Sequence, residues 1–152
     1  MRLTLFTDYC LRTLMYLSQN PDRRCTAREV AEGYKISLNH IVKVVHRLSQ
    51  LGYIEGTKGK GGGIRLRMKS EDINLWAMVQ ELESDFTLVE CFDKKHNTCR
   101  IVSACGLKVI LHDAMKAFSA ILAQYSIADA VAQPKLFAPL LAPDRKEGEK
   151  IS

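Results

Sequence analysis

The sequence predicts a mostly α-helical fold with a small β-hairpin: a winged helix-turn-helix domain followed by a long dimerisation helix. Three observations lead to this prediction. Two capped helical patterns lie within residues 26–51, a Gly-rich basic segment joins two strand-like runs within residues 53–68, and an apolar seam of heptad-like spacing covers residues 107–125. A short helix, a turn, a longer helix and a hairpin form a winged helix, whose second helix enters the DNA major groove.

The first helix is predicted over residues 7–19, with an apolar leucine stripe and an Asn-Pro stop. Asp8 falls in its first turn, where a carboxylate is favourable because the helix dipole is positive there. Cys10 falls on the apolar side of this helix, so we expect it to be a small core residue. Cys25 precedes the second helix and has no partner in the sequence pattern.

The helix-turn-helix is predicted from two capping signals. Thr26 and Glu29 form a capping box, which predicts a short helix from residue 27 to about residue 32 that Gly33 ends. Ser37 caps a longer helix that runs to Gly52. Its expected buried face consists of Leu38, Ile41, Val45, Leu48 and Leu51. The opposite face is polar, and we expect its first two turns to contact base edges.

The predicted wing is a hairpin with a basic, flexible tip. Residues 58–63 contain four glycines and two lysines between strand-like runs at 53–57 and 64–68. Glycines let the backbone approach DNA, and the lysines supply charge. A nucleotide-binding phosphate loop is the rival interpretation, but no Gly-Lys-Ser/Thr ending opens a helix here. With the recognition helix, the DNA-binding candidates are Thr26, Arg28, Ser37, Asn39, His40, Lys43, Lys58, Lys60 and Arg65.

Two more helices are predicted after the wing. Residues 73–83 should close the core with the apolar side chains of Leu75, Trp76, Val79 and Leu82. The next helix carries an apolar seam made of Leu107, Leu111, Ala114, Phe118, Ile121 and Tyr125. One small domain cannot easily bury so long a seam, so we expect this helix to pair with a second copy of the chain. Ser126 and Asp129 can cap a last short helix.

Between these helices lies a loop with three cysteines, Cys91, Cys99 and Cys105. Thiolates in one loop suit an iron-sulfur cluster or zinc, although the tight Cys-x-x-Cys spacing of zinc sites is absent. Iron-sulfur clusters and structural zinc sites usually have four protein ligands, so a fourth ligand must come from outside this set of cysteines. We divide the chain into a winged helix-turn-helix domain (1–83), a cluster-binding loop (84–105), a dimerisation helix with a short C-terminal helix (106–132) and a partly disordered tail (133–152).

Composition and charge indicate the class of protein and its expected compartment. The 152-residue chain is 47% hydrophobic and 26% charged, as in globular proteins. Residues 1–70 hold 13 Lys and Arg against five Asp and Glu, whereas residues 71–152 hold nine against 12, so the N-terminal part is the expected nucleic-acid face. No apolar run reaches the ~18 residues of a membrane span, and no signal peptide opens the chain. We therefore expect a cytoplasmic protein without membrane contact.

The sequence resembles the IscR/NsrR-type family of dimeric winged-helix regulators that carry an iron-sulfur cluster. The resemblance rests on residues 3–9, on residues 60–66 of the wing and on the three loop cysteines, and it extends to about residue 140. One branch of that family places a histidine ligand three residues after its last cysteine, where this chain has Lys108. The chain is similar instead to the nitric-oxide-sensing branch, whose fourth ligand is an aspartate in the first helix of the partner subunit. That position matches Asp8.

This resemblance implies a nitric-oxide-responsive repressor. A homodimer with a 4Fe-4S cluster, or with 2Fe-2S as the alternative, would bind inverted-repeat operator DNA and release it when nitric oxide attacks the cluster, so that detoxification genes are expressed. The expected metal ligands are Cys91, Cys99, Cys105 and Asp8 of the partner subunit. No substrate-pocket signature is present, so an enzyme is not expected.

Three alternatives remain. The loop could hold structural zinc, completed by His96 or Asp93, in a regulator with another trigger. The cluster could instead sense iron or redox status. An electron carrier is the third, although such a protein has no need of a basic wing. His112 is a further substitute ligand, with an ordinary packed or solvated histidine as the competing interpretation.

Overall fold

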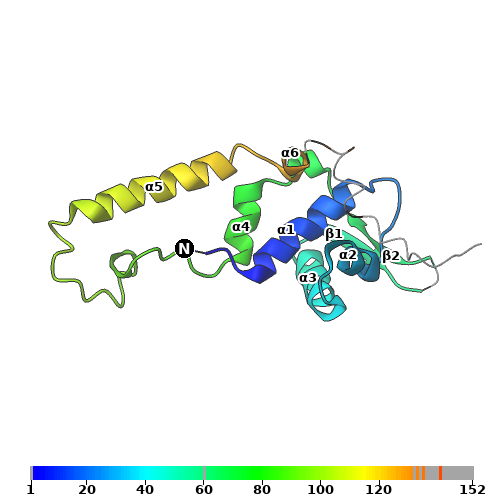
Figure 1. The fold of residues 1–152 in the computed structure, drawn as a ribbon, viewed down its shortest axis with the longest axis horizontal. Helices are drawn as coiled ribbons and strands as arrows, with labels where there is room; N and C mark the ends of the chain where they lie inside the picture. The colour runs from blue at the N-terminus through cyan, green and yellow to red at the C-terminus, as the bar shows by residue number, and fades with distance from the viewer. Residues whose placement is uncertain (1, 60, 132, 134, 136–140, 142–152) are drawn as a thin grey trace, which may run out of the picture.

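The computed structural model describes residues 2–59, 61–131, 133, 135 and 141. Its helices are α1 (Leu5–Ser18), α2 (Ala27–Tyr34), α3 (Leu38–Gln50), α4 (Leu75–Leu82), α5 (Gly106–Leu122) and α6 (Ile127–Ala130). Strands β1 (Ile54–Thr57) and β2 (Gly63–Leu66) form one antiparallel hairpin, and 3-10 turns η1 (Ser70–Asp72) and η2 (Glu90–Phe92) occur in the connections. The predicted mostly helical fold with a hairpin wing is confirmed. Figure 1 shows α3 and α5 on opposite sides of the molecule.

Helix α1 begins earlier than the sequence suggested. Thr4 is its N-cap, and the Thr4 hydroxyl accepts a hydrogen bond from the Thr7 backbone N–H at 3.2 Å. Thr7, expected at the start of the helix, is instead fully buried inside the first turn. Because a capping hydroxyl satisfies an otherwise unpaired backbone donor, Thr4 extends the helix toward the N-terminus. Asp8 remains in the first turn, as predicted.

The helix-turn-helix follows the predicted order, with one boundary changed. Both halves of the capping box are present, since Glu29 accepts from the Thr26 backbone N–H and donates its own backbone N–H to the Thr26 hydroxyl. Gly33 does not end α2, because the helix continues to Tyr34. Lys35 takes the left-handed position after the helix, at φ 55° and ψ 40°. The turn therefore begins two residues later than the glycine indicated.

An isolated β-bridge ties the hairpin to the chain before α2. Cys25 pairs with Ile64 through two backbone hydrogen bonds of 2.9 and 2.7 Å, so the chain before α2 lies against β2. Gly63 permits this approach: a Cβ there would lie 2.7 Å from the Cys25 carbonyl oxygen, and the Gly63 φ of +155° is rare for other residues. The start of β2 is thus attached to the chain that leads into α2. Lys60, predicted at the tip, lies outside the described residues.

The core gathers side chains from most of the elements of the chain. Its largest fully buried members are Leu14, Leu17, Ile41, Leu48, Ile73, Met78 and Ile127. Ile127 comes from α6, which packs on α1 and continues the core of the winged helix. The backbone N–H of Ile127 donates to the Ile73 carbonyl at 2.9 Å. The chain therefore returns to the DNA-binding domain after α5.

Helix α5 contributes no fully buried residue. It ends at Leu122, a turn before the predicted end near residue 126. Within the seam, Phe118 packs edge-on against Trp76 of α4 at 6.2 Å between ring centroids, so part of the seam is used inside the chain. Leu107, Val109, Ile110 and Ile121 are each more than half exposed. No helix in the described part of the chain is long and apolar enough to cross a membrane.

Candidate metal centre and nucleic-acid interface

The three cysteines of the loop are free thiols with partial exposure. Cys91 lies in η2, Cys99 in the irregular part of the loop, and Cys105 is the residue that precedes α5. The loop is braced at its base, because the Glu90 carboxylate accepts hydrogen bonds from the Thr98 backbone N–H and hydroxyl at 2.5 and 2.6 Å. This brace closes the segment between the first two thiols.

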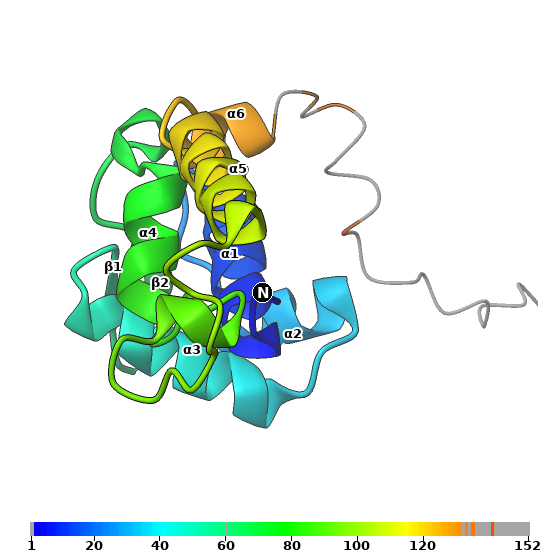
Figure 2. The ribbon, with the colours of Figure 1, turned by 90° about the vertical axis from the view of Figure 1, so that its left-hand side faces the viewer.

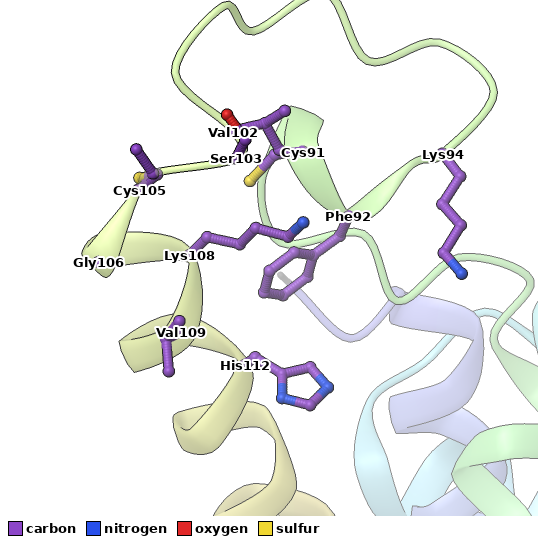
Figure 3. Close-up of a pocket in the computed structure, with 11 residues that line it drawn as sticks. Cys91, Phe92, Lys94, Val102, Ser103, Cys105, Gly106, Lys108, Val109 and His112 are labelled. Carbon is purple, nitrogen blue, oxygen red and sulfur yellow. The ribbon is translucent and has the colours of Figure 1, made fainter.

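Cys91 and Cys105 line one cavity of about 870 Å³ at the start of α5. Phe92, Lys108 and His112 also line it, and Figure 3 shows the Lys108 side chain extending from α5 toward Cys91 and Phe92. Phe92 and His112 pack edge-on at 6.3 Å. Cys99 is not among the lining residues. The structure therefore brings two of the three predicted thiols to one cavity, which is wide enough for an inorganic cluster.

The predicted ligands do not converge on a single point. Within the described residues, no three His, Cys, Asp or Glu side chains are placed to hold a metal ion. The donor set nevertheless fits an iron-sulfur cluster in kind, since the loop carries three free thiols and two of them line an open cavity. His96 and Asp93, the residues suggested for zinc, contact each other at 2.5 Å.

Asp8 is engaged within its own chain. Its two carboxylate oxygens accept from the Arg12 guanidinium, at 3.1 Å to Nε and 2.7 Å to a terminal nitrogen. Both side chains are more than a third exposed. Arg12 also lies over the Tyr34 ring, 5.9 Å from its centroid. The pair was not predicted, although an Asp and an Arg four residues apart on a helix signal such a pair.

Two contacts join the cysteine loop, α1 and the recognition helix. The Glu83 carboxylate, where the loop begins, accepts from the Thr4 backbone N–H at 2.7 Å and from its hydroxyl at 3.1 Å. In both ribbon views the N-terminus lies beside the beginning of this loop (Figures 1 and 2). Next to Asp8, the Tyr9 ring contacts the His40 ring of α3, with 5.8 Å between centroids. The residue after a predicted metal ligand therefore touches a predicted DNA-binding residue.

The DNA-binding candidates on the helices are all exposed. Ser37 caps α3 by accepting from the His40 backbone N–H, and Asn39, His40 and Lys43 are exposed on its first two turns. Thr26 and Arg28 are exposed at the start of α2. The candidates on α3 therefore lie at the N-terminal end of the recognition helix, where base contacts originate in other helix-turn-helix proteins.

The wing candidates differ from one another. Lys58 is exposed on the turn of the hairpin, whereas Lys60 lies outside the described residues. Arg65 is exposed but donates to the Glu55 carboxylate across the hairpin at 2.6 Å, and Arg24 approaches the same carboxylate at 3.5 Å. Because Arg65 already has a carboxylate partner, a contact with DNA phosphate would compete with that ion pair.

The remaining cysteines belong to the core. Cys10 is fully buried, as predicted for a small core residue, and burial raises the pKa of its thiol to about 12. Cys25 is also fully buried, and burial raises the pKa of its thiol as well. Both thiols are therefore neutral near pH 7, and neither is positioned as a ligand.

Comparison with known proteins decides the family. The model of the Rrf2 family, described as an iron-dependent transcriptional regulator, matches residues 3–133. The chain belongs to the Rrf2 family. The HTH-type transcriptional regulator NsrR of Bacillus subtilis (strain 168) is 48% identical over 132 residues, which cover 86% of this chain and 90% of that one. NsrR of Shouchella clausii (strain KSM-K16) is 46% identical over 132 residues, which cover 86% and 89%.

Membership of the Rrf2 family agrees with the architecture. The structure of IscR from T. potens aligns with a TM-score of 0.68 at 16% identity, over 87% of each chain, which supports the winged-helix fold. This Rrf2 protein is a DNA-binding transcriptional regulator and not an enzyme. The exposed polar end of α3 is its expected contact with DNA.

Proposed function

We propose that this Rrf2 protein is a nitric-oxide-responsive transcriptional repressor of the cytoplasm, whose dimer holds an iron-sulfur cluster and binds an inverted-repeat operator. The observation that carries the proposal is the set of three free, partly exposed thiols in one loop, two of them at the same cavity beside α5. Relatives called NsrR, at 46–48% identity over 86% of this chain, support the assignment to a regulator of this kind.

The proposed ligands are Cys91, Cys99 and Cys105 of one chain and Asp8 of the partner subunit. Three thiolates and one carboxylate satisfy a 4Fe-4S cluster, which we favour over 2Fe-2S on the family resemblance. Lys108 cannot supply the fourth ligand, because an ammonium group has no lone pair for iron. Lys108 instead lines the cavity and brings positive charge to an anionic thiolate site.

Dimerisation through α5 is the second part of the proposal. Leu107, Ile110 and Ile121 are more than half exposed on a helix with no fully buried residue. Contiguous exposed apolar surface of this kind marks an interface, and a stable one buries at least about 1,000 Å² in total. A second copy of α5 offers the same surface. Symmetric pairing would let each α1 approach the cysteine loop of the other chain.

Asp8 is the residue that links metal to DNA in this proposal. In the ligand role it leaves Arg12 and binds iron held by the thiols of the partner. Its neighbour Tyr9 contacts His40 on the recognition helix, so a displacement of α1 changes the support of the DNA-reading surface. Two recognition helices must lie about 34 Å apart, or a multiple of it, to enter successive major grooves. A tether through Asp8 can hold that spacing.

When bound, the cluster would supply an iron site that nitric oxide can reach. A carboxylate is a harder ligand than a thiolate and binds the iron of a sulfur cluster more weakly. If nitric oxide displaced Asp8 from iron, the bond across the dimer would be lost, and Asp8 could form the ion pair with Arg12 of its own chain. The two recognition helices then lose their fixed spacing. Operator affinity falls, and transcription resumes.

The deciding experiment is anaerobic DNA binding before and after stoichiometric nitric oxide. The coloured protein is expected to bind its operator and to release it on addition of the gas, and iron and sulfide should each approach four per chain. Values near two would replace 4Fe-4S with 2Fe-2S. A colourless, zinc-containing protein that binds DNA equally in both conditions would overturn the proposal and favour a structural zinc loop.

A further inference from the structure

The recognition helix presents one large apolar side chain to solvent. Val42 is 52% exposed, whereas its neighbour Ile41 and the nearby Val44 are fully buried. Other partly covered apolar residues of α3, such as Val45, pack against the core, and Val42 does not belong to that group. Val42 therefore lies outside the hydrophobic core cluster.

Val42 has two neighbours, Asn39 and Lys43, that are among the residues expected to contact DNA. Asn39 precedes it by three residues and His46 follows it by four, so all three lie on one side of the helix. Lys43 is next to it in sequence, and these four side chains are all exposed. Val42 falls in the second turn of α3, within the part of a recognition helix that enters the major groove.

The major groove offers one apolar group to such a side chain. Three of the four bases present only donors and acceptors on that edge, while thymine adds its C5-methyl group. Single exposed apolar residues are ordinary on protein surfaces. On a base-contacting surface, however, the environment of Val42 affects the binding free energy. Contact with polar base edges would weaken binding, whereas contact with a methyl group would strengthen it.

We propose that Val42 contacts a thymine C5-methyl group in each operator half-site and so selects a T·A pair there. This inference rests on the DNA-binding role of α3, and it does not depend on the nitric oxide response. Val42 contributes sequence discrimination through apolar contact, while Asn39 and Lys43 can hydrogen-bond to adjacent base edges. The wing and the start of α2 can contact phosphates, which contribute affinity without discrimination.

The test uses the holo protein and the duplex it selects from a random-sequence pool. Each thymine of that duplex is replaced in turn by deoxyuridine, which keeps the hydrogen-bonding edge and removes only the methyl group. Wild-type protein is expected to lose about fourfold in affinity at one thymine position per half-site, since one buried methyl is worth about 0.8 kcal/mol. Replacement in both half-sites should cost about 15-fold, if the two effects add.

Variants then locate the contact. Val42→Ala should bind the thymine and deoxyuridine duplexes almost equally, whereas Val42→Ile should retain the discrimination. Ser49→Ala, at an exposed position near the end of the same helix, is the matched control and should behave as wild type. Because both positions are exposed, all three variants are expected to fold, and circular dichroism checks this.

Two results would overturn the inference: no deoxyuridine position that weakens the wild-type complex, or a methyl effect of the same size in Val42→Ala. A protein that selects no duplex would contradict both this inference and the proposed function. A protein that selects a duplex, shows the Val42 effect and ignores nitric oxide would contradict the proposed function alone.

Discussion

At residue scale, Asp8 is held by an interaction weak enough for a metal to replace. Its partner Arg12 lies four residues away on the same helix, with side-chain exposures of 38% and 43% for the two residues. Exposed pairs of this spacing contribute only about 0.3–0.5 kcal/mol. A bond from iron to the carboxylate easily exceeds that contribution, so Asp8 can exchange partners without unfolding α1.

The exchange predicts the behaviour of an Asp8→Ala variant. Its cluster should be more labile than that of the wild type, because three thiolates remain and the fourth iron corner is open to solvent. Visible absorption and bound iron, followed over time under anaerobic conditions, measure the loss. Asp22→Ala removes an exposed aspartate outside the helices and serves as control. Identical spectra and iron retention in all three proteins would exclude Asp8 as a ligand.

The five thiols should divide into two classes of reactivity. In metal-free protein near pH 8, iodoacetamide is expected to label Cys91, Cys99 and Cys105, which are partly exposed. Cys10 should resist labelling, because its raised pKa, about 12, keeps the thiol protonated and burial blocks access. Cys25 should resist for the same reasons. Mass spectrometry of the labelled native protein checks this, with urea-unfolded protein as the control in which all five react.

The sequence contains much of the site at this scale, but not the contacts between distant elements. Cysteine spacing marked the loop, and helix periodicity placed Asp8 in a first turn. The pair of Asp8 with Arg12 was not predicted, although its spacing of four residues on a helix is a local signal. The contacts of Tyr9 with His40 and of Thr4 with Glu83 join residues 31 and 79 positions apart, so no local pattern indicates them.

At the scale of elements, the capping box of α2 predicts a pH dependence. Partial burial opposes ionisation of Glu29, but hydrogen bonds from Thr26 and Arg23 outweigh it and lower the pKa of the Glu29 carboxyl. A lowered folded-state pKa means that the stabilisation is present above the unfolded value of about 4.3 and is lost as pH falls through the folded value.

Glu29→Gln should therefore be less stable than the wild type at pH 7, by about 0.5 kcal/mol, and this difference should shrink at an acidic pH below the unfolded value of about 4.3. Urea unfolding at the two pH values measures it. Glu32→Gln, exposed on the same helix, should show a smaller difference that changes little between them. A Glu29→Gln difference that stays constant with pH would show that the carboxylate charge does not stabilise α2.

The exposed apolar side chains of α5 predict a homodimer. Ile110→Asp should weaken the dimer at least tenfold, because Ile110 is 65% exposed in the single chain and an unpaired carboxylate is costly to bury in an interface. Sedimentation at a series of concentrations gives the dissociation constant. Lys116→Asp places the same charge elsewhere on α5 and should change it little. Monomeric wild-type protein at micromolar concentration would contradict dimerisation through α5.

Element boundaries show where local patterns are insufficient. The capping box and Ser37 placed α2 and α3 within a residue or two, because their caps are local hydrogen bonds. Gly33 misplaced the end of α2, since Lys35 adopts the left-handed conformation instead. The pairing of Cys25 with Ile64 and the return of α6 to the core depend on the tertiary fold, which sequence periodicity does not encode.

At the scale of the molecule, the recognition surface and α5 lie on opposite sides, and α1 runs between them (Figures 1 and 2). The cysteine loop is linked to the start of α1 through Glu83, and α1 contacts α3 through Tyr9 and His40. A change at the loop can therefore reach the DNA-binding surface through one helix. The central claim is that iron joins the loop of one chain to Asp8 of the partner subunit.

Mixed dimers test this claim most directly. One chain carries Asp8→Ala with its thiols intact, and the other carries Cys91→Ser, Cys99→Ser and Cys105→Ser with Asp8 intact; two affinity tags isolate the mixed dimer. Only a bridge between chains makes one complete site there. The account predicts one cluster per mixed dimer with wild-type absorption and iron retention. A mixed dimer whose cluster is as labile as that of the Asp8→Ala homodimer would contradict it.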